Sequence, residues 1–147
     1  MAAKSGVLLR DMRGFEKIKN LDYIVFDKTG TLTKGEFGVT DVTAFSLSES
    51  GQSLRNEIIS LAASVEYYSQ HSIAKGILIE AKKRKLKVIP AKNFKSYPGK
   101  GADGQVNGKV VTVGNKVLME DLKIAVSDLK LNDGKTAVLV AVDKKLI

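Results

Sequence analysis

Asp27 is the residue of this sequence best placed to act as a nucleophile. It ends the apolar run DYIVFD and is followed by Lys28, Thr29, Gly30 and Thr31. An unbroken apolar run bounded by a turn predicts a strand buried on both faces, and open α/β sheets carry their chemistry at the C-terminal ends of such strands. Gly30 permits a tight turn that presents backbone N–H groups, and the threonine hydroxyls add donors. The pattern favours a phosphoryl group held beside a carboxylate nucleophile.

Two amphipathic helices are predicted on either side of His71, the only histidine of the chain. Apolar residues recur at helical spacing through residues 54–65 and again through residues 73–81. Upstream, residues 37–47 alternate between apolar and polar types and predict a half-buried strand, while residues 6–19 predict a mildly amphipathic helix. The histidine therefore lies at a junction between helices.

Strands predominate after Ala91. The pair Asn107-Gly108 lies between two strand-like runs and predicts a hairpin with a two-residue turn. Residues 116–123 predict a short helix that opens near Asn115, and residues 135–142 predict a further apolar strand. This order of elements indicates an α+β domain inserted after the opening strand of another fold.

Composition limits the possible partners. The chain has 147 residues, 44% of them apolar, which suits a globular core, and it has no cysteine for a disulfide or thiolate metal site. No apolar run approaches the roughly 18 residues of a membrane span, so the chain as given is expected to be soluble. The net charge of +8 favours an anionic partner. The basic run at 82–87 has no interleaved aromatic residues, which favours a solvated helix end over a nucleic-acid site.

The sequence DKTGTLT resembles the phosphorylation motif of P-type ATPases, within the haloacid dehalogenase-like superfamily. The resemblance implies that Asp27 accepts the γ-phosphate of ATP, that Lys28, Thr29 and Thr31 complete the catalytic loop, and that Asp27 and Thr29 form part of a Mg²⁺ site. Phosphatases of the superfamily usually carry a second aspartate two residues after the nucleophile. Because Thr29 stands there, attack by water is poorly assisted and the acyl phosphate persists. Thr29 therefore favours a pump over a phosphatase.

The stretch EYYSQHS resembles the E-x-x-S-x-H-P motif of heavy-metal-transporting P-type ATPases, and PGKG and VGN resemble glycine motifs of the same nucleotide-binding domain. An adenine ring needs a flat apolar slot with a few hydrogen-bonding groups, and glycines let backbone approach it closely. The resemblance implies an ATP site made of seven residues: Glu66, Ser69, His71, Gly99, Gly101, Gly114 and Asn115.

Ser72 is a departure from the motif, which has proline at this position. A proline would occupy the first helical position, where its fixed φ helps and its missing N–H costs nothing. We expect serine to cap the helix through its hydroxyl instead. ATP binding should persist, but with lower affinity than with proline.

The resemblance also implies an organisation in which an antiparallel sheet with a helical hairpin, the nucleotide-binding domain, is inserted into a partly present haloacid dehalogenase-like α/β phosphorylation domain. Residues 1–35 would begin the phosphorylation domain, residues 36–142 would form the nucleotide-binding domain, and residues 143–147 would be the hinge back. Later family motifs, T-G-D and G-D-G-x-N-D, do not occur. We therefore expect this chain to bind ATP without completing turnover.

The implied partners are the remaining phosphorylation, actuator and transmembrane domains of a membrane transporter, with this chain as a cytoplasmic part. Copper is the first expectation for the cargo, with zinc, cadmium or cobalt as alternatives, and neither the transported ion nor a nucleic acid should bind here. Two other functions stay open. One is a phosphatase with a cap domain, which would release phosphate from small esters without binding ATP. The other is a basic nucleic-acid-binding module, with affinity that falls steeply with salt.

Overall fold

A computed structural model describes residues 17–26, 38–45, 51–126 and 135–147 of the chain. The chain divides into two compact units, residues 1–35 and residues 36–147. In the described part of both units, no helix is long and apolar enough to cross a bilayer.

In the first unit, the described residues form a 3-10 helix, η2 (Lys17–Asn20), followed by residues 21–26, which have no regular secondary structure. The predicted buried strand is wrong for this segment: residues 21–26 belong to no strand, and Tyr23 and Val25 are 86% and 93% exposed. An apolar run becomes a buried strand only when neighbouring strands satisfy its backbone and cover its faces. Within residues 17–26, no second strand is present to do so.

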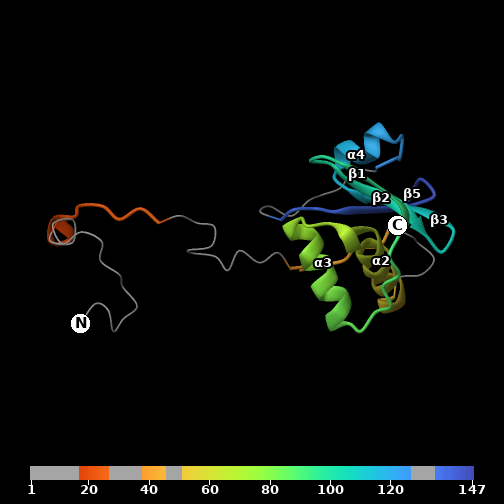
Figure 1. The fold of residues 1–147 in the computed structure, drawn as a ribbon, viewed down its shortest axis with the longest axis horizontal. Helices are drawn as coiled ribbons and strands as arrows, with labels where there is room; N and C mark the ends of the chain where they lie inside the picture. The colour runs from red at the N-terminus through yellow and green to blue at the C-terminus, as the bar shows by residue number, and fades with distance from the viewer. Residues whose placement is uncertain (1–16, 27–37, 46–50, 127–134) are drawn as a thin grey trace. The chain divides into compact units, whose positions relative to one another are not determined.

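The second unit is built on a five-stranded antiparallel sheet whose strands follow one another in chain order (Figure 1). Its strands are β1 (Lys92–Tyr97), β2 (Gly101–Val106), β3 (Lys109–Gly114), β4 (Leu139–Val142) and β5 (Lys145–Leu146). Each strand pairs with the next, so every connection within the sheet is local except the one from β3 to β4, which contains a helix.

Two tight turns fix the register of these strands. Asn107 and Gly108 have φ of 51° and 81°, so the predicted two-residue hairpin between β2 and β3 is confirmed. Asp143 and Lys144 form a second such turn, with φ of 46° and 65°, and the Asp143 carboxylate accepts a hydrogen bond from Val110 N–H at 3.0 Å. This turn folds β5 back onto β4.

Helices cover both faces of the sheet. The predicted pair is confirmed as α2 (Gln52–Val65) and α3 (Ser72–Lys83), which a short 3-10 helix, η3 (Glu66–Tyr68), connects. They lie on one face, and α4 (Lys116–Asp121) lies on the other (Figure 1). The alternation of side chains along each strand explains both layers. The α2–α3 side of the core contains Ile58, Ile59, Ala62, Ile77, Ala102, Val106, Val111, Val113 and Val140. The α4 side contains Met119, Ile124, Leu139 and Ala141.

The alternating segment upstream of α2 is only partly as predicted. Val39, Val42 and Ala44 pack against the core of α2 and α3, while the residues between them are exposed. The segment is therefore half-buried, as its pattern predicts. Over residues 38–45, however, no strand is formed.

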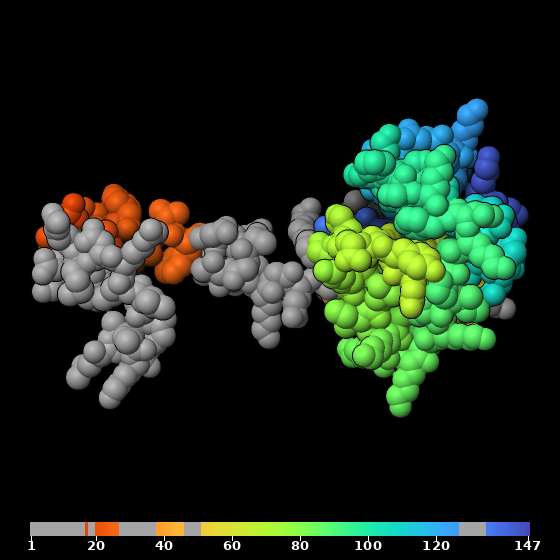
Figure 2. Space-filling model, viewed as in Figure 1, coloured from red at the N-terminus to blue at the C-terminus, as the bar shows by residue number. Residues whose placement is uncertain are grey.

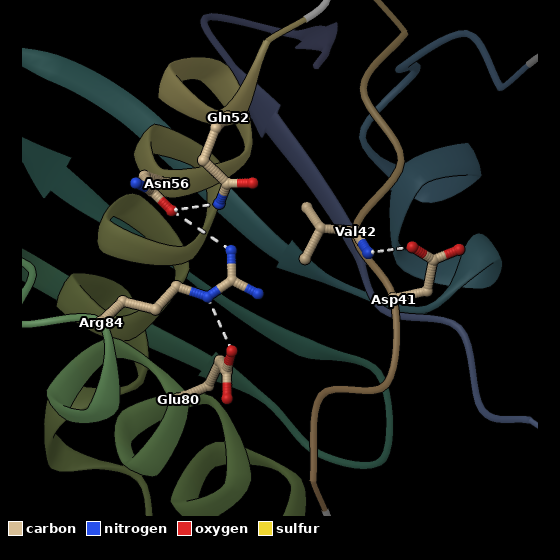
Figure 3. A network of polar contacts seen from close by, with 6 residues as sticks. All are labelled: Asp41, Val42, Gln52, Asn56, Glu80 and Arg84. Carbon is tan, nitrogen blue, oxygen red and sulfur yellow. Dashed lines mark hydrogen bonds and ion pairs between the residues drawn. The ribbon is translucent and has the colours of Figure 1, made fainter.

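A polar cluster links the two long helices (Figure 3). The Arg84 guanidinium, just after α3, contacts Glu80 Oε1 at 2.6 Å and donates to Asn56 Oδ1 on α2 at 3.2 Å. Gln52 donates to the same Asn56 oxygen at 3.0 Å. Because one guanidinium bridges both helices, the hairpin that carries His71 at its other end is held at a fixed spacing.

Candidate functional site

His71 is the residue immediately before α3, and its side chain caps that helix. Its backbone is extended, with φ of −66° and ψ of 143°, and its Nδ1 accepts a hydrogen bond from Ile73 N–H at 3.3 Å. Its own N–H donates to Ser69 Oγ at 3.3 Å, and Ser69 N–H donates to the Glu66 carbonyl at 2.9 Å. The three predicted residues of this stretch thus form one hydrogen-bonded turn.

The expectation that the Ser72 hydroxyl caps α3 is wrong, because the imidazole of His71 occupies that role. Ser72 is instead the first helical residue, which is the position that proline would take. An Nδ1 that accepts a hydrogen bond is unprotonated, so a neutral ring carries its proton on Nε2. The His71 side chain is exposed, and it therefore presents one N–H donor to the solvent.

Gly99 lies at the turn between β1 and β2. Lys100 N–H donates to the Tyr97 carbonyl at 2.9 Å, and Gly99 has φ of 70°. Pro98 before this glycine completes the residue pattern of a type II turn, in which only glycine adopts the third position without strain. A Cβ on Gly99 would have no atom within 4 Å. The outer side of this turn is therefore open.

Gly101 and Gly114 face each other across β2 and β3. A Cβ on Gly101 would overlap the Val113 carbonyl oxygen, and one on Gly114 would overlap the Lys100 carbonyl oxygen. Both would also press on Leu118 Cδ2 of α4, at 2.9 Å and 2.6 Å respectively. Close packing of two strands and a helix therefore explains these two glycines without any ligand.

Asn115 joins the glycine turn to α4. Its Oδ1 accepts from Leu118 N–H at 3.0 Å and caps the helix, as the sequence predicts. Its Nδ2 donates to the Gly99 carbonyl at 3.1 Å, and its backbone N–H donates to the Lys100 carbonyl at 2.8 Å. The side chain fixes the position of the turn.

The seven residues therefore form two groups, one at the α2–α3 junction and one where the β1–β2 turn meets the start of α4. A contact absent from the sequence prediction connects their elements: the rings of Tyr68 on η3 and Phe94 on β1 have centroids 6.5 Å apart. Tyr67 packs edge-on against Tyr68 at 5.2 Å. Tyr68 is still 59% exposed, and no local pattern in the sequence points to its contact with Phe94.

Charged groups surround the glycine turn. Lys100 Nζ lies 2.6 Å from Asp121 Oδ2. On β1, the Tyr97 hydroxyl donates to Asp103 Oδ2 at 2.7 Å, and this bond raises the pKa of Tyr97 above its ordinary value. Lys95 Nζ lies 4.8 Å from the centre of the same ring. A polar ligand at this turn would meet cations at residues 95 and 100.

A cavity of about 430 Å³ lies elsewhere, between residues 38–45, the two long helices and residues 135–140. Most of its wall is apolar, including Val42, Ile58 and Ile77. None of the seven predicted residues lines it. The position of this cavity is explained by residues 38–45, which cover the core without joining the sheet. Because charged ligands need polar groups that converge, the chemistry favours the His71 turn over this cavity.

Asp27, Lys28, Thr29 and Thr31 lie outside the described residues, and so does the proposed Mg²⁺ site at Asp27 and Thr29. Elsewhere, in the residues that the structure does describe, no three histidine, cysteine or acidic side chains are grouped to hold a metal ion.

Heavy-metal P-type ATPases are among the known proteins similar to this chain. Copper-exporting P-type ATPase B of Archaeoglobus fulgidus is 43% identical over 144 residues, which cover 95% of this chain and 20% of that protein. A probable cadmium-transporting ATPase of Listeria monocytogenes is 40% identical over 157 residues, covering 99% of this chain and 22% of the relative. The chain therefore spans about a fifth of the length of these curated relatives.

Solved structures agree in fold. The catalytic CPx-ATPase domain CopB-B superposes with a TM-score of 0.63 at 31% identity, covering 99% of this chain and 47% of that one. The N-domain of HMA6, a copper-transporting P-type ATPase, superposes with a TM-score of 0.57 at 29% identity, covering 74% of this chain and 91% of that one. The predicted fold class, with its antiparallel sheet and helical hairpin, is confirmed.

The profile of the haloacid dehalogenase-like hydrolases matches residues 21–146, which is most of the chain. The chain belongs to the haloacid dehalogenase-like hydrolase family, and in sequence and fold it is similar to the catalytic region of heavy-metal P-type ATPases.

Proposed function

We propose that this chain is the ATP-binding part, with the phosphorylation loop, of a heavy-metal-transporting P-type ATPase. The observation that carries the proposal is the His71 turn, in which Glu66, Ser69 and His71 are linked by hydrogen bonds and the imidazole presents a free Nε2–H. A donor fixed on a turn that also carries the Glu66 carboxylate would suit a purine, which offers ring nitrogens as acceptors and an exocyclic amine as donor. Similarity to the CopB-B catalytic domain over 99% of the chain supports the assignment.

In this proposal Asp27 takes the γ-phosphate of ATP, with Lys28, Thr29 and Thr31 around it. Mg²⁺ would be held in part by Asp27 and Thr29 and would neutralise charge on the phosphates. Residues 1–35 would belong to the phosphorylation domain, and the sheet unit would bind the nucleotide. Alone, the chain would bind ATP without completing turnover.

Gly99 and Asn115 take more specific roles here. The Gly99 turn is open on its outer side and is held by the Asn115 side chain, so it can approach a ligand without a Cβ in the way. Gly101 and Gly114 would act only indirectly, by letting that turn pack against α4.

Copper is the proposed cargo of the full transporter, because the relatives include a copper-exporting ATPase at 43% identity. A cadmium transporter at 40% identity makes cadmium the alternative. The transmembrane and actuator domains of the same protein would be the partners of this chain, which would face the cytoplasm.

The test is calorimetric titration of the 147-residue chain with ATP and with ADP, comparing wild type, His71→Ala and His71→Asn. Asparagine is as good a helix cap as any residue, so His71→Asn keeps the start of α3 and removes only the imidazole. We expect both variants to lose about tenfold or more in ATP affinity, as for the loss of a hydrogen bond of 1–2 kcal/mol. Wild-type affinity in His71→Asn would show that the imidazole does not contact the nucleotide. Release of phosphate from small esters, without ATP binding, would favour a phosphatase instead.

A further inference from the structure

The two groups of residues in the proposed ATP site contain no apolar side chain. The α2–α3 junction supplies Glu66, Ser69 and His71, and the other group consists of three glycines and Asn115. A purine base is flat and largely apolar, and sites for such rings are lined mainly by apolar and aromatic side chains. If a purine binds here, the wall that contacts its ring therefore comes from residues outside these seven.

Two exposed aromatic rings lie on the elements that lead into the two groups. Tyr68 is on η3, three residues before His71. Phe94 is on β1, five residues before Gly99. The two rings contact each other, yet Tyr68 is 59% exposed and Phe94 is 36% exposed. On the face shown in Figure 2, the yellow surface around η3 borders the green surface of β1. The pair therefore presents an aromatic surface to solvent beside both groups.

A β-bulge in the edge strand β1 turns Phe94 toward the helices. Between the pairs 92/105 and 95/103, β1 has two residues where β2 has only Gly104. Ser96 pairs with Ala102, which is buried against α2 and α3, so alternation places Phe94 on that same face. Counted from Lys92 without the extra residue, Phe94 would face the other side of the sheet. Bulges of this kind redirect side chains and are common beside binding sites.

The angle between the two rings suits a flat ligand. The ring planes of Tyr68 and Phe94 are 65° apart, so a base that stacks flat on one ring meets the edge of the other. Stacked and edge-to-face contacts are both favourable between π systems. Aromatic side chains stack on any base, because every base has a π face. The pair therefore offers contact to the base without choosing among bases.

We propose that Tyr68 and Phe94 form the wall against which the purine base of the nucleotide stacks. The inference rests on the proposed function, which makes ATP the ligand. It is carried by the exposure of both rings, by the bulge that directs Phe94 toward η3, and by their place beside both groups of the site. In this arrangement the aromatic pair supplies affinity for the base, and the hydrogen-bonding groups of Glu66 and His71 supply the selection of adenine.

The experiment compares the ATP affinity of variants of the 147-residue chain by calorimetric titration. Tyr68→Leu and Phe94→Leu remove a ring but keep an apolar side chain, whereas Tyr68→Phe and Phe94→Tyr keep the ring. We expect each leucine variant to bind ATP at least about fivefold more weakly than wild type, and each ring-keeping variant to bind within about twofold of it. The matched control is Tyr23→Leu, which removes an exposed ring from the first unit and should bind as wild type.

Proton NMR of adenosine distinguishes stacking from a displaced turn. The ring current of an aromatic side chain shifts the protons of a stacked base upfield. The adenine H2 and H8 signals should therefore move upfield on addition of wild type or Tyr68→Phe, and much less with Tyr68→Leu. Because Tyr68 is largely exposed, Tyr68→Leu should keep its melting temperature within about 2 °C of wild type, so a loss of binding would not reflect unfolding.

The outcomes separate this inference from the proposed function. If wild type bound ATP and both leucine variants bound it equally well, the aromatic wall would be overturned and the proposed function would stand. Equal weakening in Tyr68→Leu and Tyr68→Phe would also overturn it, because the hydroxyl and not the ring would then be responsible. If wild type did not bind ATP, the proposed function and this inference would fall together.

Discussion

Replacing Ser72 by proline should stabilise this chain. Ser72 is the first residue of α3, where the N–H has no intrahelical acceptor to lose. His71 before it already has ψ of 143°, within the range that a residue preceding proline requires. Where the native backbone is compatible, a new proline stabilises by about 0.4–1 kcal/mol, because it restricts the unfolded chain. For a chain of this size, that is a rise of about 1–4 °C in melting temperature.

The same change should tighten ATP binding if His71 is part of the site. A proline at 72 limits the motion of the turn from Ser69 to His71, so less freedom is lost when the nucleotide binds. If the whole 0.4–1 kcal/mol appeared in binding, the dissociation constant would fall about two- to fivefold. The effect on affinity should therefore be no larger than the effect on stability.

Thermal unfolding and calorimetric titration of the same samples measure both quantities. Ser72→Ala is the control, since it removes the hydroxyl without fixing φ, and we expect it to leave affinity within twofold of wild type. A lower melting temperature for Ser72→Pro would refute the helix start observed at residue 72. A higher melting temperature with an unchanged ATP dissociation constant would refute the idea that rigidity before α3 limits binding.

Three further predictions concern the fold and the turn. Arg84→Ala should destabilise the chain by about 1 kcal/mol in urea unfolding, because a half-buried ion pair and a bond to Asn56 are lost; no change would mean that the α2–α3 link is not stabilising. Gly101→Ala should lower the free energy of unfolding by about 3 kcal/mol or more, because a Cβ there would overlap the opposite strand. Gly99→Ala should lower it by only about 1 kcal/mol, because the space beside Gly99 is open. Equal losses in the two variants would contradict this packing. The pKa of Tyr97 is raised in the folded chain, so the unfolded chain loses the phenol proton first, and the free energy of unfolding should fall as pH rises above about 10. Tyr97→Phe should make this fall less steep. If wild type and Tyr97→Phe lost stability equally at alkaline pH, the hydrogen bond to Asp103 would be ruled out as its cause.

Helices and turns were predictable because their causes are local. The spacing of Ile58, Ala62 and Val65 is a property of α2 alone, and Asn107-Gly108 adopts positive φ whatever surrounds it. The conformation of residues 21–26, where a strand was predicted and none is formed, was not predictable in the same way. Its apolar residues fit burial between other strands, and burial depends on elements that the described part of its unit does not supply.

In the candidate site, too, some features follow from the local sequence and others depend on the folded structure. The order of Glu66, Ser69 and His71 identified a turn, but not that the imidazole itself caps α3. Histidine is an uncommon cap, and residue type alone favoured the neighbouring serine. Only the backbone conformation at His71 and Ser72 decides between them. Likewise, the contact of Tyr68 with Phe94 joins residues 26 positions apart, which no local pattern encodes.

A residue can belong to a binding motif without touching the ligand, and the glycines of this chain make the distinction testable. Gly101 and Gly114 are explained by the overlap that a Cβ would cause with the opposite strand. Loss of ATP binding after their replacement would therefore report a displaced turn as readily as a lost contact. His71→Asn does not share this ambiguity, because the helix cap is kept and only the exposed imidazole is removed. If that variant melts as wild type and fails to bind ATP, the nucleotide contact is assigned to one side chain.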